Sequence, residues 1–324
     1  MRCLVIGGAG FIGVAVCREL MRRGVETIAA GRTSRPYGTF TSHLAFDRTD
    51  DSQLASALEA SRPDVLVDLA AFQAADVLSV VERFRGARYV FVSTGVYPDL
   101  NGRPAREEDF RPLEGSPPPR DAAGDPRRGR EAYLAGKRWC ETVLARSSGF
   151  PWVSIRPPAV FGADDHTLRI AAYLQRIEDG GPLLVPAESY RRQAGLAWSR
   201  DVGYACALAC DLSREVGGPY NVAFEGVSLE RLLVSLGRAM GREPELVPVP
   251  FAELPPAASP YGPDPRRSAG YDLSRSRAEL RFEPSALEDA LPETLAWYLA
   301  RRPSHPGYAE RPRELALVAG LSRG

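Results

Sequence analysis

The chain has almost no lysine and little histidine or cysteine, and each shortage excludes a class of site. Of its 324 residues, only three are histidines and five are cysteines. The histidines, His43, His166 and His305, lie far apart in the sequence, so we expect no histidine-based metal site. The cysteines form no Cys-x-x-Cys pair and stand among apolar residues. They are therefore predicted to be small buried hydrophobic side chains in a reducing compartment.

An excess of one charge and long apolar runs are also missing. The 41 basic residues balance the 41 acidic ones, so there is no electrostatic case for a nucleic-acid partner. No apolar run approaches the length of a membrane span. A strand expected from residue 2 leaves no room for a signal peptide. We therefore expect a cytoplasmic protein that acts on a small molecule and binds neither nucleic acid nor membrane.

Among the 41 basic residues there is a single lysine, Lys137, and it stands four residues after Tyr133. Arginine is a planar group that stays charged, whereas lysine is a compact cation with a tunable charge. A chain that uses arginine almost everywhere keeps lysine where arginine cannot replace it. The spacing from Tyr133 places both side chains on one face of an expected helix.

The first 160 residues alternate short β-rich runs with helical patterns, and this alternation predicts an α/β fold with a doubly wound parallel sheet. The expected strands are Arg2–Ile6, Glu26–Ala30, His43–Phe46, Val65–Leu69, Tyr89–Val92 and Trp152–Ile155, and the expected helices between them are Phe11–Arg23, Ser52–Ala60, Ala74–Phe84 and Arg130–Arg146.

Two domains are expected. Residues 1–160 should form the first, with a Pro-, Gly- and Arg-rich insertion over 99–130 that we interpret as a lid. Residues 161–324 have shorter elements and frequent proline. They should form mainly a smaller, mixed substrate-binding cap, some segments of which return to the sheet. The tail after Pro303 is weakly patterned and is expected to be partly mobile.

Glycines follow the first expected strand with the spacing Gly7-x-x-Gly10-x-x-Gly13. Gly7 permits a tight turn, Gly10 lets the backbone approach a pyrophosphate, and Gly13 lets the helix pack close to the sheet. Phe11 and Ile12 open that helix, whose N-terminus supplies free N–H groups and positive potential. The strand-turn-helix context predicts that residues 1–160 bind a dinucleotide.

The identity of the dinucleotide depends on the end of the second strand. An NAD site has a carboxylate there, but the sequence is Ala30-Gly31-Arg32-Thr33-Ser34. Arginine and hydroxyl groups suit a 2′-phosphate, so NADP is favoured over NAD. Alternatively, Arg32 stacks on adenine or only solvates the loop. Asp47, after the third strand, could accept a hydrogen bond from the adenine amino group or simply cap a turn.

Ser93, Thr94, Tyr133 and Lys137 are the candidate reactive residues. A phenol shuttles protons poorly at neutral pH unless a nearby cation stabilises its phenolate, and Lys137 can do this for Tyr133. The same ammonium can hold the hydroxyls of the nicotinamide ribose. Ser93 and Thr94 follow the fifth strand, at the edge where open α/β sheets bind ligands, so a hydroxyl there could orient a substrate oxygen.

Together these motifs resemble the short-chain dehydrogenase/reductase superfamily, within its extended, NAD(P)-dependent epimerase/dehydratase-like branch. The resemblance covers most of the chain and implies a Rossmann-type domain. It implies that Tyr133 and Lys137 are catalytic, and it selects Ser93 over Thr94 because Ser93 lies four residues before the tyrosine of the Val96-Tyr97 pair. Thr94 is then expected to contact the substrate.

The resemblance also implies further cofactor contacts and an assembly. The cofactor contacts would come from Asp47 and Arg48, from Leu69-Ala70-Ala71, from Lys137, and from Arg156, which opens an Arg-Pro…Val-Phe-Gly turn. The assembly would be a homodimer formed through the helices before the sixth strand, including the helix that carries Lys137.

The substrate side departs from the family pattern. No acid follows Thr94 before Asp99, which disfavours dehydration. Arg192 and Arg266 could hold the phosphates of a nucleotide sugar, but surface charge explains them equally well.

These residues predict an NAD(P)-dependent enzyme that acts on a secondary alcohol or ketone, as a sugar or nucleotide-sugar epimerase or reductase. Two alternatives stay open: an NADPH-dependent ketoreductase of a secondary metabolite, and a non-catalytic dinucleotide-binding regulator. The intact Ser93, Tyr133 and Lys137 argue against the regulator.

Overall fold

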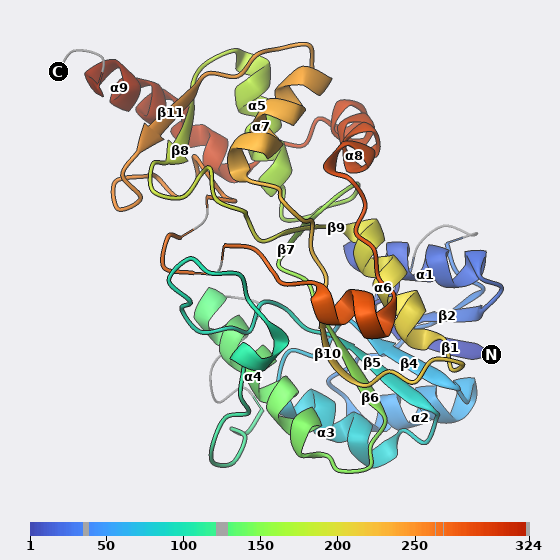
Figure 1. Ribbon diagram of the computed structural model, residues 1–324. Helices are drawn as coiled ribbons and strands as arrows, with labels where there is room; N and C mark the ends of the chain where they lie inside the picture. The colour runs from blue at the N-terminus through green and yellow to red at the C-terminus, as the bar shows by residue number, and fades with distance from the viewer. Residues whose placement is uncertain (35–38, 121–128, 263, 268, 322–324) are drawn as a thin grey trace.

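A seven-stranded parallel sheet forms the centre of the computed structural model, which describes residues 1–34, 39–120, 129–262, 264–267 and 269–321 (Figure 1). The strand order is β10-β6-β5-β4-β1-β2-β3. The order reverses beside β1, as in dinucleotide-binding sheets. The predicted doubly wound α/β fold is confirmed. The strands are β1 (Arg2–Ile6), β2 (Glu26–Ala30), β3 (Ser42–Leu44), β4 (Val65–Asp68), β5 (Arg88–Val92), β6 (Trp152–Arg156) and β10 (Gly218–Asn221).

Helices cover both faces of this sheet, which is why its central strands are apolar throughout. In β1, Cys3 and Val5 face one core cluster while Leu4 and Ile6 face another, because successive side chains alternate between the faces. All five cysteines are free and buried. The first face carries α1 (Phe11–Arg22) and α6 (Ser199–Cys210), and the second carries α2 (Asp51–Ser61), α3 (Ala74–Arg83) and α4 (Arg130–Arg146).

A second body with its own apolar core lies beyond the carboxyl ends of the strands (Figure 1). Its segments come mostly from residues 159–321, while α6 and β10 pack with the large sheet. The division into two domains at residue 160 stays a prediction. The elements of this body are β7 (Ala159–Phe161) paired with β9 (Leu196–Trp198), β8 (Leu183–Pro186) paired with β11 (Leu246–Val249), and the helices α5 (Arg169–Asp179), α7 (Leu229–Ala239) and α8 (Leu287–Arg301).

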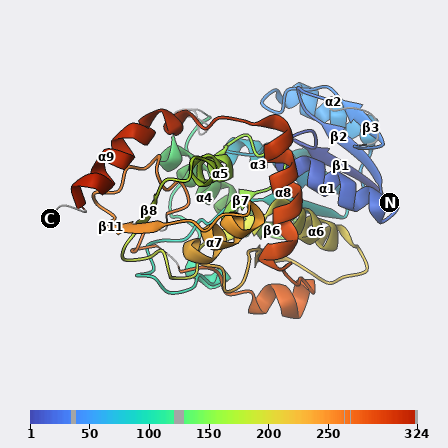
Figure 2. The same ribbon diagram turned by 90° about the horizontal axis from the view of Figure 1, so that it is seen from above.

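The C-terminal tail is helical over residues 306–321 and has no apolar stripe, in agreement with its weak sequence pattern, while its partial mobility stays a prediction. A short helical turn (Pro306–Glu310) leads into α9 (Arg311–Leu321), at the end of the cap that lies far from α1 (Figure 2). Two ion pairs fasten α9 to α5: the buried pair of Arg176 and Glu314 at 2.5 Å, and the partly buried pair of Arg311 and Asp179 at 2.7 Å. Buried charges hold the helix, and a search for an apolar stripe cannot detect them.

The insertion after β5 is tied to two distant segments over its described residues. Ala105 pairs with Tyr271 through a backbone bridge, and the Leu113 N–H donates to the Thr142 hydroxyl of α4 at 3.0 Å. Residues 121–128 lie outside the described part of the chain, so the lid stays a prediction. Among the residues described, none of the helices combines the length and the apolar character that crossing a membrane requires.

Candidate active site

The glycine turn between β1 and α1 is shaped to hold a phosphate. Gly7 has a φ of +81°, and its N–H donates to the Ala30 carbonyl at 2.8 Å. A Cβ on Gly13 would lie 2.1 Å from the Gly7 carbonyl oxygen, so α1 closes directly onto the turn. Gly10 is exposed, and among the described residues no side chain caps the first N–H groups of α1. Those donors are available to an anion, so the turn fits a dinucleotide pyrophosphate.

A cavity of about 1070 Å³ extends from this turn across the carboxyl ends of β4 and β5 to the cap. It brings together the predicted Ser93, Thr94, Tyr133 and Lys137 with the glycine turn and Leu69. The other lining residues that matter below are Phe72, Gly95, Arg130, Arg169, Gly195, Asp264, Arg267 and Tyr271.

Lys137 is almost completely buried at the floor of this cavity, with 2% of its surface exposed. Its Nζ donates to the carbonyls of Ala71 and Val92, each at 2.8 Å, and it pairs with no carboxylate among the described residues. The rings of Phe91 and Phe72 lie 4.6 and 4.8 Å from Nζ and stabilise the cation through their faces. An ammonium has three N–H donors, so one remains for a ligand.

Ser93 is buried beside a charged pair that supports it. Glu141 accepts from the Ser154 hydroxyl at 2.6 Å and from Arg156 Nε at 2.9 Å. Burial alone would raise the pKa of Glu141, but Arg156, Ser154 and Ser93 together hold that pKa below its ordinary value. Ser93 Oγ makes no hydrogen bond of normal geometry among the described residues. Its hydroxyl lies beside Glu141 and also lines the cavity, so its proton can turn from the carboxylate to a substrate oxygen.

Arg156 lies behind the cavity wall rather than in it. Besides Glu141, its guanidinium donates to the Glu107 carbonyl at 2.9 Å and to the Tyr97 hydroxyl at 3.3 Å. Only 2% of the residue is exposed. With these contacts Arg156 holds Glu141 and Tyr97 in place behind the cavity, whereas the sequence predicted that it contacts the cofactor.

The residues predicted at the adenine end lie outside the enclosed cavity. Arg32 is exposed at the end of β2. Asp47 accepts from the backbone and the hydroxyl of Thr49, and these bonds, followed by Arg32, hold its pKa below the ordinary value. Arg48 is buried and donates to Asp68 at 2.8 Å. Ala70 and Ala71 follow β4, where Ala71 contributes only its carbonyl, to Lys137.

The two arginines predicted for the substrate are not brought to the cavity. Arg192 is exposed, and Arg266 is exposed and paired with Asp264 at 2.9 Å. Three other arginines line the cavity instead: Arg130, Arg169 and Arg267. In a chain with 40 arginines, no sequence signal distinguishes these three from the rest.

Positive charge is in excess in the cavity. Among the described residues, the lining includes Arg130, Arg169, Arg267 and Lys137 but only one carboxylate, Asp264. Burial, and then the neighbouring Arg267, hold the pKa of Arg130 below its ordinary value, and Asp264 only partly opposes them. Such crowding of guanidinium groups favours an anionic ligand.

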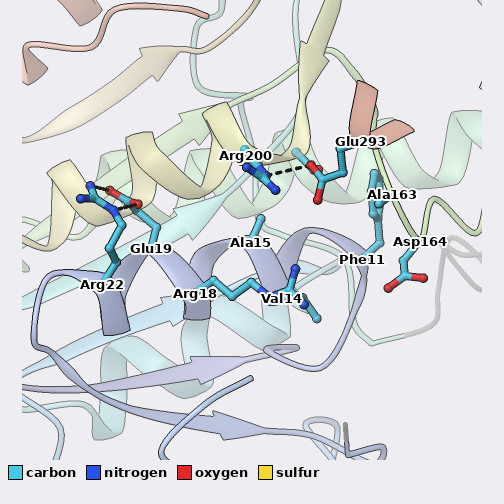
Figure 3. Close-up of a pocket in the computed structure, with 11 residues that line it drawn as sticks. Phe11, Val14, Ala15, Arg18, Glu19, Arg22, Ala163, Asp164, Arg200 and Glu293 are labelled. Carbon is cyan, nitrogen blue, oxygen red and sulfur yellow. Dashed lines mark hydrogen bonds and ion pairs between the residues drawn. The ribbon is translucent and has the colours of Figure 1, made fainter. Parts of the chain in front are cut away.

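A second cavity, of about 280 Å³, lies between α1, α6 and α8 (Figure 3). Of the predicted site residues only Phe11 lines it. Its charged side chains pair with one another: Arg22 with Glu19 at 2.7 Å, and Arg200 with Glu293 at 2.8 Å. It is therefore a groove between helices in which four of the charged side chains pair with one another. In the described part of the chain, no three histidine, cysteine or carboxylate side chains come together as a metal site requires.

Comparison with known proteins supports this interpretation of the turn. The sequence model of the NAD dependent epimerase/dehydratase family matches residues 3–82. Over 267 residues the chain is 28% identical to the chloroplast stem-loop binding protein of 41 kDa b of Arabidopsis thaliana, an alignment that covers 76% of this chain and 65% of that protein. The chain thus spans slightly less than two thirds of the length of this curated relative.

Two solved structures share the whole architecture. UDP-glucose 4-epimerase of Thermus thermophilus, in complex with NAD, superimposes with a TM-score of 0.65 at 24% identity and covers 93% of this chain and 100% of its own. UDP-glucose 4-epimerase of Thermotoga maritima, with UDP-glucose, gives a TM-score of 0.68 at 19% identity and covers 94% and 100%. At these identities the likeness shows the fold. Residues 3–82 thus match the NAD dependent epimerase/dehydratase family, and the chain as a whole shares the fold of these two epimerases.

Proposed function

We propose that the protein is an NAD(P)-dependent enzyme that transfers hydride at a secondary alcohol or ketone, as a nucleotide-sugar epimerase or reductase. The observation that carries the proposal is the position of Ser93, Tyr133 and Lys137. They come from β5 and α4 and line one cavity, which begins at the glycine turn. A regulator that only bound a dinucleotide would not need all three.

Each of the three side chains has a distinct task in this proposal. A bound nicotinamide supplies the hydride acceptor or donor. Tyr133 gives a proton to the reacting oxygen or takes one from it, and Ser93 donates a hydrogen bond to that same oxygen. The third N–H of Lys137 holds the ribose hydroxyls, and its charge stabilises the Tyr133 phenolate.

The arginines of the cavity favour a phosphorylated substrate over a neutral ketone. Arg130, Arg169 and Arg267 line the cavity from three separate segments, α4, α5 and the loop before Tyr271. Two or more guanidinium groups suit the oxygens of a diphosphate. We therefore propose a nucleotide sugar as the substrate and residues 161–324 as the main substrate-binding part. From the family resemblance, we also propose a homodimer as the assembly.

We further propose NADP as the preferred cofactor, because Arg32 is exposed at the end of β2 and no acid stands beside it in the sequence. Substitution Arg32→Ala is expected to weaken NADP binding about ten- to hundredfold, since it removes a charged contact to the 2′-phosphate. NAD binding should change less than threefold. Both dissociation constants can be measured by titration calorimetry, with Arg313→Ala on α9 as the control. Equal losses for the two dinucleotides would contradict the preference.

The function is tested by supplying NAD or NADPH with UDP-glucose, UDP-glucuronic acid and simple ketones. We expect either interconversion of the C4 epimers of one UDP-sugar without net use of cofactor, or reduction of NAD as one UDP-sugar is oxidised to its ketone. Because one relative is named a stem-loop binding protein, RNA hairpins should be tested in parallel at physiological salt. Tight hairpin binding without turnover of any substrate would contradict the proposed enzyme.

A further inference from the structure

Tyr271 occupies a slot between two glycines at the wall of the active-site cavity. A Cβ on Gly95 would lie 2.1 Å from the Tyr271 hydroxyl oxygen, and a Cβ on Gly195 would lie 3.1 Å from its Cε2. The ring of Tyr97 packs edge-on against the Tyr271 ring, at 5.6 Å between centroids. Any larger side chain at position 95 would overlap the phenol.

These two glycines provide space rather than an unusual backbone. Neither Gly95 nor Gly195 has a positive φ, so an L-residue could adopt the backbone of either. The constraint on Gly95 is therefore the phenol itself, and the constraint on Gly195 is the phenol together with the Pro158 ring. The segments that carry Gly95 and Gly195, 100 residues apart in the sequence, both leave room for the side chain of Tyr271.

The backbone around Tyr271 is also fixed. The Ala105 N–H donates to the Gly270 carbonyl at 3.1 Å, and the Asp272 N–H donates to the Ala105 carbonyl at 2.9 Å. Only 7% of Tyr271 is exposed. The hydroxyl is thus held in one place before any ligand arrives, which lowers the cost of using it in binding.

The Tyr271 hydroxyl faces the same cavity as Ser93 and Tyr133 and has no hydrogen-bond partner among the described residues. Burial raises the pKa of Tyr271, although Arg156 opposes this. The group therefore stays protonated at neutral pH and can donate. The hydroxyl is not among the sealed-off polar atoms of the described residues, so it reaches the cavity, where a ligand oxygen can accept from it.

We propose that the Tyr271 hydroxyl binds a second substrate oxygen, beside the one held by Ser93 and Tyr133, and so selects polyhydroxylated substrates over isolated ketones. Ser93 and Gly95 are two residues apart, so their Cα atoms are separated by at most about 7 Å. One sugar ring can bridge that distance. This role rests on the proposed function, and it makes the Tyr271 hydroxyl the group that selects the substrate of that enzyme.

The test compares Tyr271→Phe with Tyr190→Phe, which removes a hydroxyl from a buried tyrosine outside the cavity. Tyr271→Phe should raise KM for the sugar substrate about tenfold, the value of one hydrogen bond. Its kcat should stay within threefold, and its Kd for the dinucleotide should not change. Among deoxy analogues of the substrate, the one that lacks the bound hydroxyl should show equal KM with wild type and Tyr271→Phe. An unchanged KM, or the same increase for every analogue, overturns the proposal.

A second variant tests the slot itself. Gly95→Ala should displace the hydroxyl and raise KM as Tyr271→Phe does, and Gly95→Ala combined with Tyr271→Phe should be no worse than Tyr271→Phe. Additive losses in the double variant overturn the proposal. If wild type turns over no substrate, the proposed function fails, and UDP-glucose binding to the NAD-loaded protein decides the role of Tyr271. A tenfold weaker Kd in Tyr271→Phe then supports that role, while equal Kd values or no binding by either protein overturn it.

Discussion

Substitution Tyr133→Phe is expected to lower kcat about 10²–10⁴-fold, which is the usual contribution of one positioned acid–base group. The substitution removes only a hydroxyl. The ring keeps its place 6.1 Å from that of Phe72, so the wall of the cavity and the glycine turn should be undisturbed. The Kd for the dinucleotide should therefore stay within about twofold. Tyr204→Phe on α6 makes the same change outside the cavity and should keep full activity.

The comparison of kcat with dinucleotide binding distinguishes a catalytic role of Tyr133 from a structural one. Loss of both would mean that Tyr133 supports the fold of the site, and melting temperature would reveal this directly. An unchanged kcat in Tyr133→Phe, with the wild type active, would contradict the assigned mechanism. The proton would then have to come from another group that lines the cavity, such as Tyr271.

The sheet and its helices could be predicted from the sequence because their signals are local. Helix α4 has the predicted bounds, Arg130–Arg146, and β1, β2 and α1 agree with prediction to within one residue. A run of buried β-branched residues, or a glycine turn before a helix, needs no knowledge of distant segments. The same holds for Tyr133 and Lys137, since one helical turn brings them to one face.

Features made by distant segments could not be predicted. Arg156 and Arg48 were assigned to the cofactor from motif position, but each has a buried carboxylate partner on another element, Glu141 or Asp68. A pattern search sees the arginine and not the partner. Likewise, the need for glycine at positions 95 and 195 can be recognised only once Tyr271 is seen to pack between them.

The single lysine of the chain gives the other large effect. Lys137→Met is expected to lower kcat about 10²–10³-fold, comparable to the loss of one preorganised electrostatic contact. Folding should suffer little. The buried cation has two carbonyls and aromatic faces as partners but no carboxylate among the residues described, so removing it also removes a desolvation cost. The melting temperature should therefore fall by only a few degrees, although the Ala71 and Val92 carbonyls lose their donor.

Lys137→Arg separates the charge of this residue from its shape. A guanidinium is planar and wider than an ammonium, and the rings of Phe72 and Phe91 enclose the space around Nζ. We expect Lys137→Arg to be as inactive as Lys137→Met and to melt at a lower temperature, since it forces a larger charged group into the same site. The reverse exchange Arg22→Lys, on the exposed surface of α1, should change neither activity nor stability. Calorimetric melting and kcat would be measured for all three variants. Full activity in Lys137→Arg would mean that any positive charge suffices at this position, and that the one lysine in the chain has no chemical role that arginine cannot fill.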